Sequence, residues 1–201
     1  LQDYIGRMRE GQEAIYYITA DSLAAAASSP HLEVFRKHGI EVLLLGDPVD
    51  EWWVTHLPEF EGKKLVSAAK GELDPALLGA DDDDTDKARK DAAESELKPL
   101  TERLKQALGE RVEAVRVSHR LTDSAACLVV AESEFNLGMQ RMLKAAGQAV
   151  PMGKPTLEIN PDHALVQTVQ ALPEESPDVS DWALVLFDQA LLVEGGELED
   201  P

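Results

Sequence analysis

Apolar positions in the first 78 residues alternate between strand-like runs and helical spacings. Residues 15–19 are β-branched and aromatic, and 42–45 form a continuous apolar run, so both segments predict strands. Helices are predicted over 23–27, capped by Ser22, and over 31–38. Continuous apolar strands are typical of a sheet buried on both faces. We therefore predict parallel strands joined by a right-handed crossover.

The next part of the chain changes in composition. Residues 81–84 are four consecutive aspartates, and 81–96 hold eight acidic side chains against three basic ones. Such a segment buries too little apolar area to offset its ordering entropy, so a mobile linker is predicted over 79–91. A calcium site is excluded because the required ligand spacing around a glycine turn is missing.

Residues 92–201 predict a second unit with three strands. Helices are predicted over 97–108, 135–147, 161–172 and 179–194, and strands over 112–120, 126–131 and 156–160, the first two strands paired. The predicted fold class is α/β, of the α+β kind, with two small units. The chain opens on Leu1 without an initiator methionine and closes on an Asp-Pro pair, so we expect a piece of a longer protein.

The charge balance narrows the classes of partner. Nineteen Lys and Arg against 38 Asp and Glu give a net charge of −19, which argues against nucleic acid and against anionic membranes as partners. No apolar run approaches the ~20 residues of a membrane span. A single cysteine excludes an internal disulfide and suits a reducing cytoplasm.

Residues that could carry catalysis are few. The chain has no glycine-rich phosphate loop, CxxC pair or HExxH motif, so neither a catalytic nor a metal site is predicted. Cys127 and His119 could meet as a thiol–imidazole pair, but an inert buried thiol is the favoured interpretation. Asp50 and Glu51 are interpreted as first-turn acids of a helix.

Three features instead predict binding surfaces. Helix 135–147 carries one apolar face, made of Phe135, Met139, Met142, Leu143 and Ala146, which is either core or an adaptable binding surface. Helix 179–194 is apolar almost all round, so its outer side needs a second copy of the chain or a further segment. Trp52 and Trp53 point about 100° apart, which places one inward and the other at the rim as an anchor.

Seven ordered blocks resemble the bacterial ninety-kilodalton heat-shock chaperone family, the high-temperature protein G group. The blocks are Ile15–Thr19, Val42–Leu45 with Asp47–Trp52, Arg116–Ser124, Ala145–Gln148, Leu157–His163, Asp188–Leu192 and Leu198–Pro201. Together they span nearly the whole chain outside the acidic segment.

The resemblance implies a domain assignment and a function. Residues 1–78 would be the last α/β part of the middle domain, and 92–201 the C-terminal dimerisation domain without its final helix. The family is a cytoplasmic, ATP-dependent, homodimeric stress-response chaperone that binds non-native client proteins. ATP and Mg would bind the full-length form outside this chain, so no catalytic residue and no cofactor are expected here.

The resemblance also implies site residues. Client contacts fall on Trp52, Phe135, Met139, Met142 and Leu143, where Phe135 and Leu143 are apolar variants of the family pattern. Dimer contacts fall on Trp182, Val185, Leu186, Gln189 and Leu192. The family dimer uses the last two helices of each chain, of which only 179–194 is present here. The alternative function is a purely structural dimerisation module without client contact.

Overall fold

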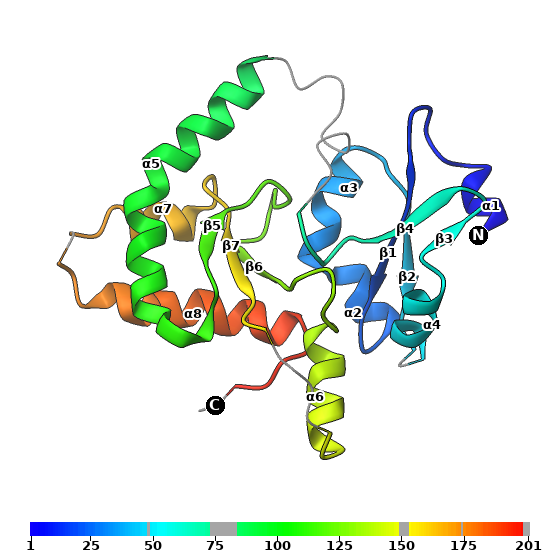
Figure 1. Cartoon of the computed structure of the whole chain (residues 1–201). Coiled ribbons are helices and arrows are strands. Elements are labelled where there is room, and N and C mark those ends of the chain that lie inside the picture. The colour runs from blue at the N-terminus through cyan, green and yellow to red at the C-terminus, as the bar shows by residue number, and fades with distance from the viewer. Residues whose placement is uncertain (48, 73–83, 149–152, 174, 199–201) are drawn as a thin grey trace.

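The computed structural model builds two α/β units that lie side by side (Figure 1). It describes residues 1–47, 49–72, 84–148, 153–173 and 175–198, and of 84–91 and Ala145 only the backbone. The predicted fold class is thereby confirmed. Among the described residues, no helix is both long enough and apolar enough to cross a membrane.

The first unit is built on a four-stranded sheet of order β2-β1-β4-β3. Its strands are β1 (Ala14–Thr19), β2 (Val42–Leu45), β3 (Glu59–Phe60) and β4 (Lys63–Ser67). β1 is parallel to both β2 and β4, which confirms the predicted parallel pairing, and β3 closes an antiparallel hairpin with β4.

The 42–45 run was expected to form a strand buried on both faces, but another strand of the sheet is buried in this way. β2 lies at the sheet edge, and Leu44 is 36% exposed, so the prediction for the 42–45 run was wrong. The strand buried on both faces is the central β1, in which residues 14–18 are all buried. An apolar run alone does not tell an edge strand from a central one, because that depends on which strands pair on either side.

Short helices cover both faces of this sheet. They are α1 (Gln2–Ile5), α2 (Leu23–Ser28), the 3-10 turn Pro30–Leu32, α3 (Glu33–Lys37) and α4 (Asp50–His56). Ser22 caps α2 as predicted, because its side chain accepts from the Ala25 N–H at 3.1 Å. Tyr16 and Phe35, with ring centroids 5.0 Å apart, pack in the core between β1 and α3.

The second unit has a three-stranded sheet of order β5-β7-β6. β5 (Val115–Val117) is parallel to β7 (Thr156–Ile159), and β6 (Ala126–Val129) is antiparallel to it. The prediction that the first two strands pair directly was wrong. β7 inserts between them because the loop after β5 crosses to the first unit, as described below.

The described helices of this unit are α5 (Asp84–Leu108), the 3-10 turn Gly109–Arg111, α6 (Leu137–Ala145), α7 (Ala164–Gln170) and α8 (Asp178–Val193). The backbone of 84–91 is helical and forms the first part of α5, whereas residues 79–83 of the predicted linker lie outside the described residues. α8 packs on α5 and on β6. The two-residue period of β7 sends Leu157 and Ile159 into that core and Glu158 to the opposite face of the sheet.

The two units are joined by buried charges, beginning with Glu33 of α3. Its carboxylate accepts hydrogen bonds from the backbone N–H groups of Thr122 (2.6 Å) and Asp123 (2.8 Å) and from the Ser124 hydroxyl (2.5 Å). These donors form the loop between β5 and β6, so an acid of one unit fixes a loop of the other. The loop therefore does not join β5 and β6 as a short hairpin.

Arg120 makes the reciprocal contact. Its guanidinium is 1% exposed, donates to the Ala68 carbonyl (2.9 Å) and the Gly71 carbonyl (2.8 Å) of the first unit, and pairs with Glu158 at 3.0 Å. The Gly71 N–H in turn donates to the Val130 carbonyl at 2.9 Å. Each unit thus satisfies buried polar groups of the other.

Acid is expected to weaken the Glu33 contact. Burial alone raises the pKa of Glu33, but the hydrogen bonds from Ser124, Asp123 and Thr122 outweigh burial and hold the pKa below its usual value. A lowered folded-state pKa means that this stabilisation is complete above the unfolded-state pKa of about 4.3 and is lost as the pH falls through the folded-state value.

The variant Glu33→Gln tests this reasoning. We expect it to lower the free energy of unfolding by about 1–3 kcal/mol at pH 7, because charged hydrogen bonds become neutral ones. The difference from the unmodified chain should shrink as the pH approaches 3, measured by urea unfolding. A difference that stays constant across that range would contradict the assignment.

Candidate functional site: an apolar surface where the two units meet

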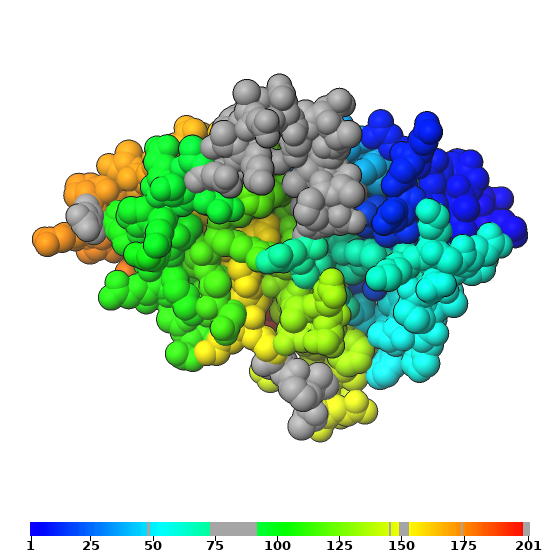
Figure 2. Space-filling view, turned by 45° about the horizontal axis from the view of Figure 1, so that its top comes forward, coloured from blue at the N-terminus to red at the C-terminus, as the bar shows by residue number. Residues whose placement is uncertain are grey.

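Apolar side chains of the two units meet at Trp52 of α4 and at Phe135, which precedes α6. The Trp52 and Phe135 rings lie 5.5 Å apart between centroids, tilted by 53°. Trp52 and Met142 are each 43% exposed, and Val49 is exposed beside Trp52 at the start of α4. We call Val49, Trp52, Phe135 and Met142 the junction surface. Figure 2 shows the yellow-green segment that includes α6 against the cyan segment of the first unit.

Glu51, the neighbour of Trp52 on α4, points into the protein. It is 2% exposed and contacts the Thr19 hydroxyl and the Lys70 ammonium, both at 2.5 Å. It also accepts from the Asn136 N–H at 3.2 Å. Asn136 caps α6 by accepting from the Met139 N–H at 2.8 Å. A buried carboxylate of α4 therefore contacts the first residue before α6, which holds the junction surface together.

The structure separates the predicted client-contact residues of α6. Met139 and Leu143 are only 5% and 6% exposed, so for these two the core alternative holds in the single chain. Met142 is exposed and Phe135 is half-buried. Gln140 is also buried, so the inward face of α6 is centred between Met139 and Leu143. Met142 lies about 100° away from Leu143 and therefore faces solvent.

The tryptophan pair behaves as predicted. Trp52 is the exposed member, whereas Trp53 is half-buried and donates from its indole N–H to Asp50 at 2.8 Å. One ring thus lies at the rim of the surface while its neighbour packs against the fold.

A second apolar surface lies on α8. Val185 and Leu192 are 40% and 53% exposed, and on the same side of the helix Trp182 is half-buried and Gln189 is exposed. Leu186 is 1% exposed in the core of the second unit, so its prediction as a dimer contact was wrong. Residues 182, 185, 189 and 192 share one face at about 100° per residue, whereas Leu186 lies toward the sheet.

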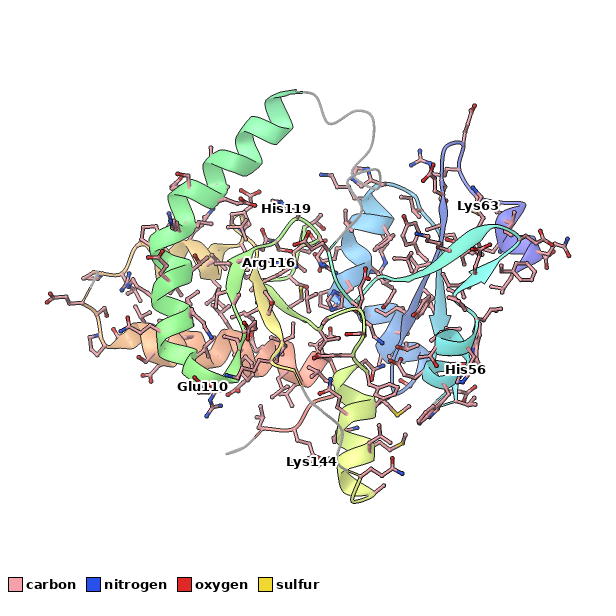
Figure 3. All side chains as sticks on the ribbon, viewed as in Figure 1. His56, Lys63, Glu110, Arg116, His119 and Lys144 are labelled. Atoms are coloured by element: carbon pink, nitrogen blue, oxygen red, sulfur yellow. The ribbon has the colours of Figure 1, made fainter. Side chains whose placement is uncertain are left out.

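The thiol–imidazole pair, which was the disfavoured alternative for Cys127 and His119, does not form. His119 contacts Glu94 of α5 at 2.8 Å, and Figure 3 places it with Arg116 on the α5 side of the second unit. Cys127 is buried and lies 4.0 Å from the Glu158 carboxylate. Burial, with Glu158 adding to it, raises the pKa of this thiol well above its usual value, which confirms the inert buried thiol. The described residues contain no cluster of three or more His, Cys, Asp or Glu arranged to hold a metal ion.

A family model described as "Hsp90 protein" matches residues 1–201. The chain belongs to the Hsp90 protein family. Similar curated proteins carry the name "Chaperone protein HtpG". The one from Alkalilimnicola ehrlichii is 61% identical and that from Halorhodospira halophila 57% identical, each over 201 residues and 100% of this chain. The chain spans 30% and 31% of the length of these two relatives.

Sequence reasoning missed the buried charges that join the two units of this Hsp90 family member. Glu51 is interpreted from sequence as a first-turn acid, and Glu33 occupies the same kind of position on α3. Both carry a second role, because their carboxylates reach the other unit. The available signal was weak: an acid in the first turn is common on solvated helices, and only tertiary structure shows that its helix end is buried.

Proposed function

We propose that this chain is part of a molecular chaperone and that its junction surface holds unfolded or partly folded client proteins. The supporting observation is that exposed Trp52 of one unit packs on Phe135 of the other and that Met142 is exposed on the helix after Phe135, in a family whose relatives are named chaperones. Residues 1–78 would belong to the middle domain and 92–201 to the C-terminal dimerisation domain. ATP and Mg would bind the full-length cytoplasmic protein outside this chain.

The chemistry of this surface suits weak and varied binding. Non-native chains expose scattered apolar groups, and methionine adapts to them without fixed geometry. Fully burying one large apolar side chain contributes about 1.5–3 kcal/mol, and Trp52 and Met142, each 43% exposed, are already partly covered in the single chain. The cost of association reduces the net affinity further, so clients can be released. The net charge of −19 disfavours self-aggregation of a protein that keeps apolar groups exposed.

The variant Met142→Glu tests the client surface. We expect it to reduce the suppression of aggregation of a chemically unfolded model protein, measured by light scattering, by roughly threefold or more, because a charge in the surface opposes apolar burial. The matched control is Leu44→Glu, which adds the same charge at an exposed leucine on β2. Leu44 shares its sheet face with Val42, which packs on the α3 side, and so lies away from Trp52.

The two variants separate the candidate functions. Equal suppression by Met142→Glu, Leu44→Glu and the unmodified chain, with circular dichroism showing an intact fold, would remove the client surface. The remaining candidate would then be the structural dimerisation module. For dimerisation itself we propose an isologous contact through Trp182, Val185, Gln189 and Leu192 of α8, favoured by the exposure of Val185 and Leu192.

A further inference from the structure

A cavity opens directly beside the junction surface. Its volume is about 280 Å³, and its lining comes from both units, including Asp21, Asp47 and Glu51 of the first and Met139, Met142 and Glu197 of the second. Met142 belongs both to the cavity wall and to the junction surface. A chain segment that covers this methionine therefore brings its next side chains to the mouth of the cavity.

The charges around the cavity are unbalanced. Its lining holds four carboxylates and a single cation, Arg141, which pairs with Asp21 at 2.8 Å. Glu51 is compensated by Lys70 at 2.5 Å. Asp47 and Glu197 are exposed at the mouth, and within the described ranges neither forms an ion pair. Two negative charges thus remain for a ligand to neutralise.

The wall of the cavity complements those charges. Met139 and Met142 offer thioether and methylene surface, and the volume lies just below the range of about 300–1,000 Å³ typical of small-molecule sites. One long side chain fits such a space better than a cofactor does. Lysine and arginine combine an apolar stem, which packs along apolar walls, with a charged head that stays near water and carboxylates.

We infer that this cavity receives a lysine or arginine side chain of the bound client segment, so that the surface prefers clients whose apolar residues are interspersed with basic ones. The inference rests on the proposed client surface and names its substrate class. The basic head pairs with Asp47 and Glu197 while its stem packs on the two methionines. Because the carboxylates are exposed, the preference weakens as salt is added.

Two fluorescent peptides of equal length test this inference by anisotropy. One alternates leucine with lysine, and the other carries glutamine at every lysine position. The unmodified chain should bind the lysine peptide more tightly. The double variant Asp47→Asn, Glu197→Gln should bind the lysine peptide roughly three- to tenfold more weakly at low salt. Its affinity for the glutamine peptide should be unchanged. The control double variant Glu59→Gln, Glu113→Gln makes the same charge change at two exposed acids outside the cavity lining.

Each contrary outcome has a distinct meaning. Equal binding of the two peptides by the unmodified chain overturns the inference and leaves the client surface intact. An equal loss in both double variants also overturns it, because only the overall charge would then matter. Absence of binding by both peptides removes the proposed client surface and this inference together.

Discussion

Replacing Arg120 with methionine is expected to lower the free energy of unfolding by about 3–5 kcal/mol, because it leaves buried partners without a counter-charge. Arg120 is 1% exposed, and its guanidinium donates hydrogen bonds to the Ala68 and Gly71 carbonyls and to the Glu158 carboxylate. Burial raises the pKa of Glu158, but Arg120 and then Arg116 outweigh burial and keep it lowered. Without Arg120, part of that compensation is lost inside the protein.

Urea unfolding followed by circular dichroism measures this effect, with Arg7→Met as the matched control. Arg7 pairs with Glu41 at 2.7 Å, but both side chains are largely exposed and the pair is screened by solvent, so its loss should cost far less than the loss of Arg120. The double variant Arg120→Met, Glu158→Met should recover part of the lost stability because it removes the unpaired charge. Equal costs for Arg120→Met and Arg7→Met would show that the buried contact contributes no more than a surface pair.

The second large effect is expected on α8, where neighbouring positions should behave in opposite ways. Leu186→Ala should lower the free energy of unfolding by about 2–5 kcal/mol, because it leaves a cavity in the core of the second unit. The double variant Val185→Glu, Leu192→Glu should keep the fold and abolish dimerisation, because both side chains are exposed in the single chain.

Sedimentation velocity combined with circular dichroism distinguishes the two outcomes. Folded monomers of the glutamate double variant beside dimers of the unmodified chain would support the α8 contact. Monomers in both samples at every concentration would contradict self-association of this chain through α8. A glutamate double variant that unfolds would show that this face packs within the chain.

The elements that sequence predicted correctly are those set by local chemistry. The Ser22 cap, the parallel pairing of β1 with β2 and the extent of α8 follow from short-range patterns. The order of strands in the second sheet was not predicted correctly, because β7 lies between β5 and β6, which are neighbours in sequence. Pairing over such separations depends on the whole core and leaves no local signal.

The candidate site shows the same division. Apolar periodicity correctly identified α6 as amphipathic, but it could not tell which edge of the stripe faces solvent. Met139 is buried and Met142 exposed because α6 lies against the junction between the units. The cavity beside Met142 was not predicted, since its lining comes from separate segments spread between Thr19 and Glu197.

The contact through Glu33 and Arg120 has a consequence for how the units could part. At Glu33 and Arg120 the two units are held together by hydrogen bonds and charges rather than by apolar side chains. Water can replace each of these bonds, so the faces bared by separation would be hydrophilic and readily hydrated. A rotation that opens only this contact would therefore add polar surface, whereas one that also parts Trp52 from Phe135 would expose apolar side chains.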